Sequence, residues 1–141
     1  MPFSIRIQVA PQDLDELQHV NNVVYVRWIQ EVAVAHSASV GLGLEEYRQR
    51  GALFVVRRHE VDYLRPALAG DELEVETRVV AVSPVTATRR TFIRRASDGQ
   101  LLVQAQTQWA YISTTNGRPV RIPPEVMERF AIEPIDEKCT P

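Results

Sequence analysis

Residues 13–28 read DLDELQHVNNVVYVRW, a polar loop that leads into the start of an amphipathic helix. Beyond Asn22 the apolar residues recur every three or four positions, which is the spacing of one face of a helix. Asn21 or Asn22 is suited to cap this helix, and the glycines that follow Val40 are suited to end it. The first turn of a helix has unpaired backbone N–H groups and a partial positive charge. We therefore expect a reactive site where the acidic loop meets the helix.

The rest of the chain shows mainly the two-residue alternation and the β-branched content of strands. Predicted strands cover residues 4–9, 52–64, 72–83, 86–96 and 101–113, and short helices cover residues 44–50 and 123–130. Asp98-Gly99 and Asn116-Gly117 mark tight turns, and we expect the four later strands to follow one another as hairpins. The long helix is the element able to cover the apolar face of such a sheet, which predicts the α+β fold class.

The composition is typical of one soluble globular domain. The 141 residues carry a net charge of -2 and are 45% hydrophobic, which gives no general attraction to nucleic acid or to an anionic membrane. We assign residues 1–131 to a single domain and residues 132–141 to a C-terminal tail, which contains Cys139, the only cysteine. No apolar run is long enough to span a bilayer, so we expect a cytoplasmic protein.

Two further expectations concern partners. No phosphate-binding loop, dinucleotide fingerprint or metal-ligand spacing occurs in the sequence, so we expect neither a cofactor nor a metal. An antiparallel sheet with open edges leaves backbone groups unpaired there, and a second copy of the chain is a common remedy. We therefore predict a homodimer or a homotetramer.

Two blocks of this sequence resemble hotdog-fold thioesterases. In the first, the acids Asp13 and Asp15 precede QHVNN at residues 18–22. This block resembles the signature of acyl-CoA thioesterases of the 4-hydroxybenzoyl-CoA type and of plant acyl-carrier-protein thioesterases. The second block, VDYLRP at residues 61–66, resembles the strand and turn that follow in the same superfamily. The resemblance implies a hotdog fold, in which an antiparallel sheet wraps around one long central helix, with the site between subunits. It also implies hydrolysis of an acyl or aryl thioester of CoA, or of acyl carrier protein.

The same resemblance implies three catalytic residues. Asp15 matches the aspartate of the 4-hydroxybenzoyl-CoA branch, and Asn22 matches the residue whose backbone N–H binds the oxyanion in that branch. His19 matches the histidine of the plant branch, but Leu17 stands where that branch has asparagine. Gln18 stands where the other branch has glycine. Neither known mechanism therefore transfers whole, and a non-catalytic module that binds acyl thioesters is the alternative.

The chemistry of these residues leaves alternatives open. A carboxylate such as Asp15 near a helix start can act as a general base toward water, or it can attack a thioester directly. Asp13 and Asp15 can also close Asx-type turns before the helix, and we interpret Asp13 in this way. His19 is equally suited to assist Asp15 or to be an ordinary loop histidine, because its neutral ring has both a donor and an acceptor. His36 and His59 are expected to be structural.

The remaining candidates would bind substrate. Tyr25 has the spacing of a core residue, and it is also a candidate for lining an acyl pocket. A guanidinium offers a fork of donors that suits the phosphates of CoA, but for any single arginine we prefer the explanation that it lies on a solvated strand face. The candidates for phosphate binding are Arg57, Arg58 and Arg65, together with Arg94 and Arg95.

Overall fold

The computed structural model of this protein describes residues 2–134. Its strands are β1 (Phe3–Gln8), β2 (Ala52–Tyr63), β3 (Glu72–Val82), β4 (Thr86–Arg95) and β5 (Leu101–Ser113). Its α-helices are α1 (Asn22–Ser39), α2 (Leu44–Arg50) and α3 (Pro124–Glu128), and a short 3-10 helix, η1, covers Pro11–Asp13. Residues 135–141, which include Cys139 and most of the predicted tail, lie outside the described residues.

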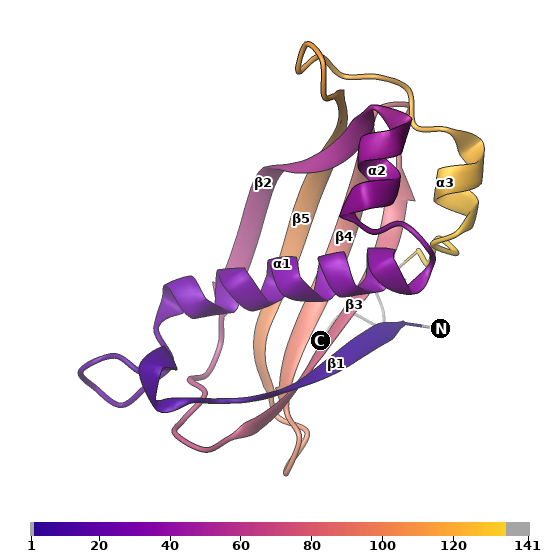
Figure 1. Cartoon of the computed structure of the whole chain (residues 1–141). Coiled ribbons are helices and arrows are strands. Elements are labelled where there is room, and N and C mark those ends of the chain that lie inside the picture. Colours follow the sequence, from indigo (N-terminus) through magenta and orange to yellow (C-terminus); the bar gives the residue numbers. More distant parts are fainter. Residues whose placement is uncertain (1, 135–141) are drawn as a thin grey trace.

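The strands form one antiparallel sheet in the order β1-β3-β4-β5-β2. α1 crosses one face of this sheet, and its first turn projects past the edge strand β2 (Figure 1). α2 and α3 lie toward the other end of α1, near the same end of the sheet (Figure 1). The predicted α+β class, with one long helix over an antiparallel sheet, is confirmed.

The connectivity of the sheet differs from the prediction in one respect. β3, β4 and β5 follow one another as hairpins, but β2 pairs with β5 and not with β3. The expectation of four successive hairpins is therefore wrong for β2. The chain after β2 contains Pro66, and its backbone N–H groups at Leu64 and Arg65 donate to the Leu102 carbonyl at 2.8 and 3.1 Å. The connection, residues 64–71, is too long for a tight turn. It runs along the end of the sheet, past β5 and β4, to the start of β3.

The core between α1 and the sheet has two parts. One lies beneath the first turns of α1 and includes Val24, Trp28, Ile29, Val32, Leu73, Val75, Ile93 and Val103. The other joins α2 and α3 to the sheet and includes Leu42, Tyr47, Val79, Tyr111, Val126 and Phe130. Burial of a large apolar side chain contributes roughly 1.5–3 kcal/mol, so both ends of α1 are fixed to the sheet. Between the two parts, β3 and β4 carry buried polar residues, namely Thr77, Arg89 and Thr91.

The chain beyond α3 stays in contact with the sheet as far as it is described. Phe130 is buried in the second part of the core, and the Glu133 N–H donates to the Val79 carbonyl at 2.8 Å. The predicted tail therefore begins in contact with β3, at Glu133. Among residues 2–134, no helix combines the length and the apolar character needed to cross a membrane.

Candidate active site at the start of α1

The acidic loop before α1 folds back on itself. Leu14 and Val20 form an antiparallel bridge, and the Asp15 N–H donates to the His19 carbonyl at 2.7 Å. Gln18 closes the turn with a φ of 61°, a left-handed conformation that costs a non-glycine residue roughly 1–2 kcal/mol. The turn thus places Asp15 and His19 opposite each other.

Asp13 holds the base of this loop. Its side chain is almost fully buried, and its two carboxylate oxygens accept from the Ala10 N–H at 2.9 Å and from Arg27 Nη2 at 3.1 Å. Its own carbonyl accepts the Asn21 N–H at 2.8 Å. Both carboxylate oxygens are therefore used within the fold, so Asp13 has a structural role, but its partners are Ala10 and Arg27 and it closes no Asx-type turn among residues 2–134.

Asp15 lies at the outer part of the loop and is only half-buried. Its Oδ1 accepts two backbone N–H groups, from Leu17 at 2.9 Å and from His19 at 3.2 Å. The Asx-type turn considered for Asp15 is therefore present. An ionised carboxylate has about four acceptor positions, and Oδ2 has no hydrogen-bond partner among residues 2–134. The same side chain can thus hold the loop and still accept a proton from water.

His19 contacts Asp15 through its backbone. No hydrogen bond within residues 2–134 joins its imidazole to the Asp15 carboxylate, and the ring is half-exposed. The backbone of His19 also forms a bridge to Leu68, in the segment that follows β2. The imidazole therefore borders the loop without a fixed partner in the described chain, and its part in catalysis stays a prediction.

The first turn of α1 presents the predicted oxyanion donor. Asn21 is the N-cap, with its side-chain oxygen accepting the Val23 N–H at 3.0 Å. The N–H of Asn22 has no hydrogen-bond partner among residues 2–134, whereas its carbonyl accepts the Tyr63 hydroxyl at 3.2 Å. Asn21 thus caps Val23 and leaves the Asn22 N–H without a partner at the positive end of the helix, where a developing oxyanion would be stabilised.

A second segment, residues 64–68, lies against the loop and the helix start. The Val20 N–H donates to the Ala67 carbonyl at 3.1 Å, and the Ala67 N–H donates to the Tyr25 hydroxyl at 2.8 Å. Tyr25 is fully buried, packs edge-on against Trp28, and has a pKa raised by burial. Sequence reasoning missed this hydroxyl contact and that of Tyr63, because nothing in the sequence shows which segment returns to the helix start.

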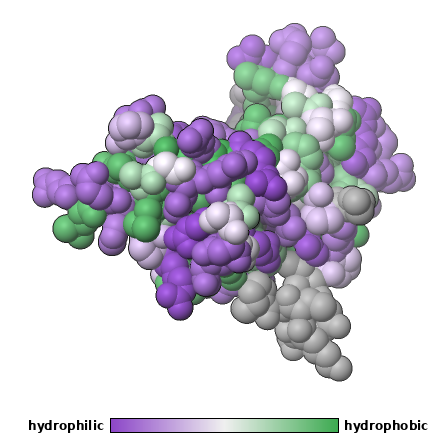
Figure 2. Space-filling model, turned by 90° about the horizontal axis from the view of Figure 1, so that it is seen from below, coloured by the Kyte–Doolittle hydropathy of each residue, from purple (hydrophilic) through white to green (hydrophobic). Residues whose placement is uncertain are grey.

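Hydrophobic side chains surround the site on the outer surface. Leu17 is 74% exposed and Val23 is 70% exposed, and both Leu64 and Leu68 are also exposed. Figure 2 shows hydrophobic surface at the end of the molecule where α1 begins. Large apolar side chains exposed together are typical of a surface that binds an apolar ligand or another chain.

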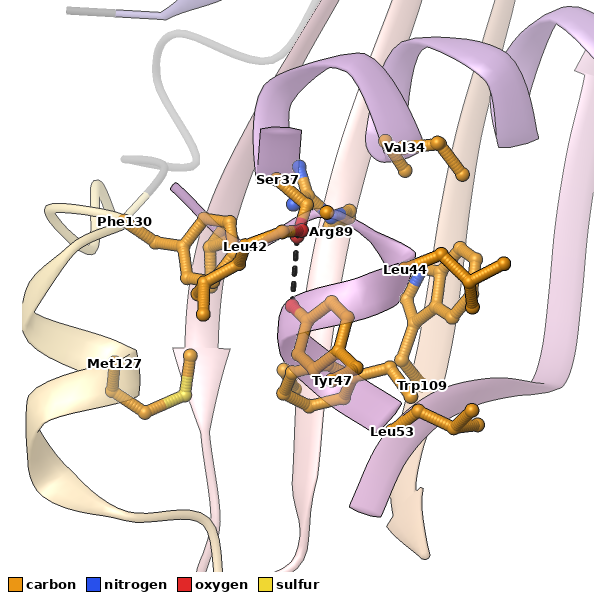
Figure 3. A pocket seen from close by; sticks show the side chains of 15 residues that line it. Val34, Ser37, Leu42, Leu44, Tyr47, Leu53, Arg89, Trp109, Met127 and Phe130 are labelled. Carbon is orange, nitrogen blue, oxygen red and sulfur yellow. Dashed lines mark hydrogen bonds between the residues drawn. The ribbon is translucent and has the colours of Figure 1, made fainter. Parts of the chain in front are cut away.

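A pocket of about 260 Å³ lies at the other end of α1, between α1, α2 and the sheet. Apolar and aromatic side chains form most of its wall, among them Val34, Leu44, Leu53, Trp109, Met127 and Phe130 (Figure 3). Its polar groups are Arg89 and the hydrogen-bonded pair of Ser37 and Tyr47, whose oxygens are 2.7 Å apart. Tyr25 is not among the residues that line this pocket, so the acyl-pocket role considered for it has no support from this cavity.

The sequence matches the thioesterase-like superfamily over residues 9–130. This chain belongs to the thioesterase-like superfamily. A curated relative is the chloroplastic acyl-acyl carrier protein thioesterase ATL3 of Arabidopsis thaliana, which is 24% identical over 126 residues. That alignment covers 89% of this chain and 66% of the plant protein. The chain thus spans slightly less than two thirds of the length of this relative.

Solved structures of similar fold include thioesterases. A putative oleoyl thioesterase from Lactobacillus plantarum has a TM-score of 0.90 and 23% identity, over 97% of this chain and 53% of that one. A thioesterase from Thermus thermophilus, complexed with coenzyme A and Zn, has a TM-score of 0.79 and 28% identity, over 92% of this chain and 98% of that one. Together with the family match, these similarities confirm the predicted hotdog fold.

Three of the five arginines predicted to bind phosphate lie on β2 or in the segment after it. Arg57 is the extra residue of a β-bulge in the edge strand β2, and Arg58 beside it forms an ion pair with Glu60 at 2.5 Å. Arg65 is exposed in the segment that borders the acidic loop. Of these three, Arg65 is therefore nearest in the fold to the start of α1.

The other two arginines have partners within the fold. The guanidinium of Arg94 stacks over the ring of Phe92. Arg95 pairs with Asp71 and Asp98, each at 3.0 Å, and these carboxylates raise the pKa of its guanidinium. Arg95 is thus committed to the turns of the sheet. In the part of the chain that the structure describes, no group of three or more His, Cys, Asp or Glu side chains is placed to hold a metal ion.

Proposed function

We propose that this protein hydrolyses acyl thioesters at the loop that precedes α1. The observation that carries the proposal is that the loop and the helix start it leads into hold two groups without hydrogen-bond partners among residues 2–134: Oδ2 of the half-exposed Asp15 and the N–H of Asn22. Hydrolysis requires a base or nucleophile and a donor for the oxyanion. In a member of the thioesterase-like superfamily, these two groups fit both requirements.

In the proposed reaction, Asp15 accepts a proton from water as the water oxygen attacks the thioester carbonyl carbon. The carbonyl oxygen gains the negative charge, which the Asn22 N–H and the partial positive charge of the helix start stabilise. Collapse of the tetrahedral intermediate breaks the C–S bond, and the thiolate leaves and takes up a proton. In the alternative route, Asp15 attacks the carbonyl carbon, and water then hydrolyses the resulting anhydride. His19 lies beside Asp15 and is the proposed assisting residue in either route.

The proposed substrate is an acyl or aryl thioester of coenzyme A. One similar structure is a thioesterase complexed with coenzyme A, and the plant relatives are named for acyl carrier protein, which makes a carrier-protein thioester the second candidate. Arg57, Arg58 and Arg65 are exposed, and they are the proposed contacts to the phosphates of the carrier group.

The proposed assembly is a homodimer or a homotetramer. β2 is the longer of the two edge strands, and its outer edge has no pairing strand within residues 2–134. Such an edge favours pairing with a second copy. Sedimentation equilibrium at micromolar concentration would test this proposal. A mass of two or four chains is expected, and a single chain would contradict it.

The decisive test of activity is thiol release from a panel of acyl-CoAs by the wild type, Asp15→Asn and Glu16→Gln. Asparagine keeps an oxygen for the N–H groups of Leu17 and His19 but cannot act as a base. We expect Asp15→Asn to lower kcat by about 100-fold or more with an unchanged unfolding midpoint. Glu16, an exposed acid next in sequence, is the matched control, and its variant should keep wild-type turnover. Unchanged turnover in Asp15→Asn would contradict the assignment.

A binding module without catalysis is the second candidate. One observation favours it: Oδ1 of Asp15 already accepts two backbone N–H groups and so holds the turn of the loop. Calorimetric binding of acyl-CoA by the wild type, without release of free thiol from any member of the panel, would support this second function and exclude the first.

A further inference from the structure

Arg89 is a buried cation that has no acidic partner within residues 2–134. It lies on β4, its side chain is 6% exposed, and none of the ion pairs of these residues includes it. Burial lowers the pKa of its guanidinium to about 10, so it remains charged at neutral pH. A buried charge is costly unless it is paired, and a bound anion would offset this cost.

The contacts of Arg89 within the fold use only part of its donor capacity. Nη1 donates to Nδ1 of His36 at 2.9 Å and to the Thr77 hydroxyl at 3.3 Å, and the guanidinium lies 5.3 Å from the centre of the Phe130 ring. None of these three partners carries a charge at neutral pH. Thr77 and Phe130 have no ionisable side chain at that pH, and the pKa of His36 is lowered to about 4. A guanidinium has five N–H donors, and Nη2 and Nε have no hydrogen-bond partner among the described residues.

The pocket gives Arg89 access to a ligand. Arg89 is one of the lining residues of the 260 Å³ pocket, whose remaining wall is mainly apolar. The Ser37 hydroxyl donates to the Leu42 carbonyl at 2.6 Å, so the Tyr47 hydroxyl, 2.7 Å from Ser37 Oγ, donates to Ser37 (Figure 3). Both hydroxyl protons are thus used within the protein. Arg89 is the charged donor that this pocket offers to a ligand.

We propose that this pocket binds the distal end of the acyl group and that Arg89 selects acyl groups that end in a carboxylate. This inference rests on the proposed function and adds the substrate class. Val34 and Leu44, which are exposed at the pocket, and Leu53 would contact the methylene groups. A terminal carboxylate would accept a forked pair of hydrogen bonds from the guanidinium and neutralise its charge.

The size of the pocket fits such a group. An apolar cavity of roughly 150 Å³ can hold benzene, and this pocket has a volume of about 260 Å³. A purely apolar chain of the same length would also fill it, but it would leave the Arg89 charge buried and without a counter-ion.

The test compares pairs of CoA thioethers, which bind but cannot be hydrolysed. Hexyl, octyl and decyl chains would each be prepared with a terminal methyl group and with a terminal carboxylate. Titration calorimetry at neutral pH would measure their dissociation constants for the wild type, Arg89→Met and Arg90→Met. Arg90 is the next residue of β4, and its side chain lies over Phe92 on the opposite face, which makes it the matched control.

For at least one chain length, the wild type and Arg90→Met should bind the carboxylate form about tenfold more tightly than the methyl form, or better. Arg89→Met should lose this preference and keep its affinity for the methyl form within a few-fold. Equal affinity of the wild type for both forms at every chain length would overturn the proposal, even if Arg89→Met failed to fold. Equal weakening of both forms by Arg89→Met would also overturn it. This binding test requires no turnover. If the carboxylate form were preferred but the thiol-release assay on acyl-CoAs showed no activity, only the proposed hydrolysis would be overturned.

Discussion

The contact between His36 and Arg89 predicts a loss of stability in mild acid. His36 is 7% exposed, its ring stacks on Phe3 and meets Phe130 edge-on, and its Nδ1 accepts from Arg89. Burial is the main cause of its lowered pKa of about 4, the charge of Arg89 adds to it, and the charge of Glu133 opposes it. The folded protein therefore keeps His36 neutral at a pH where the unfolded chain would protonate it.

The direction and size of the effect follow from the two pKa values. The unfolded chain takes up a proton below about pH 6.5, whereas the folded chain does so only near pH 4, so the unfolded state gains stability across this interval. The difference corresponds to about 3 kcal/mol when complete. At about pH 5 the free energy of unfolding should be lower by about 2 kcal/mol than at about pH 8.

Urea unfolding measured from about pH 8 to pH 5 would test this prediction in the wild type and in His36→Gln. Glutamine cannot be protonated, and its side-chain oxygen can accept from Arg89. The variant should be less stable near pH 8 because the ring contacts are lost, but it should lose about 2 kcal/mol less than the wild type on acidification. Burial also lowers the pKa of His59, so His59→Gln serves as a second variant that should leave the His36 contribution in place.

Two results would refute this reasoning. One is an equal loss of stability in the wild type and in His36→Gln over the same pH interval, with m-values unchanged. The other is a His36 ring that titrates near its ordinary pKa in nuclear magnetic resonance spectra of the folded protein. Either result would mean that Arg89 and burial do not hold this imidazole neutral.

Three further substitutions test the packing around the two sites, each by urea unfolding. Tyr25→Phe should lower the free energy of unfolding by about 1–3 kcal/mol, because the Ala67 N–H would be left without its acceptor; a change below about 0.5 kcal/mol would contradict this. Asp13→Ala should cost about 1–3 kcal/mol through loss of the bond from Ala10 and of the ion pair, and an unaltered midpoint would argue against a structural role. Leu42→Ala should cost about 2–5 kcal/mol, since this side chain is 1% exposed, and wild-type stability would show that the site can collapse.

The elements of this fold could be predicted because their patterns are local. The spacing of apolar residues placed α1 and Leu44–Arg50 within a residue of their observed bounds, and the alternation in Glu72–Val82 matches a strand with one buried face. The pairing of β2 with β5 could not be predicted in this way. It depends on how residues 64–71 return along the end of the sheet, and those contacts join residues far apart in sequence.

The candidate site could be predicted from the sequence in so far as its candidate catalytic residues lie in one segment, residues 13–22. Asp13 and Asp15 have different roles in the structure: Asp13 is buried and accepts from Ala10 and Arg27, whereas Asp15 accepts only from the backbone of its own turn. All of these partners lie within residues 10–27, the segment that the sequence singles out. Arg89 was not predictable. It follows two threonines and an alanine and precedes another arginine, so the strand shows no apolar alternation there. Its burial results from the packing of α1, α2 and α3 around this part of β4. That packing joins residues far apart in sequence, so no local pattern predicts it.

The separation of Asp15 from Arg89 has a consequence for how a substrate would bind. Asn22, at the helix start, and Ala33, which lines the pocket, are about 16 Å apart along α1 at about 1.5 Å per residue. The start of α1 projects past β2 (Figure 1). A two-fold axis that pairs β2 with its copy would reverse α1 and carry the acidic loop of the second copy toward the pocket of the first.

Mixing two variants would distinguish a site within one chain from a site shared between two chains. Asp15→Asn and Arg89→Met, each weak on a carboxylate-ended acyl-CoA, would be combined in equal amounts and allowed to exchange subunits. In the shared arrangement, half of the dimers are mixed and each has one site with both residues intact, so about a quarter of wild-type activity should return. If Asp15 and Arg89 act on a substrate within the same chain, every site in the mixture lacks one of them. Activity that stays at the level of the separate variants after exchange would therefore contradict the shared site.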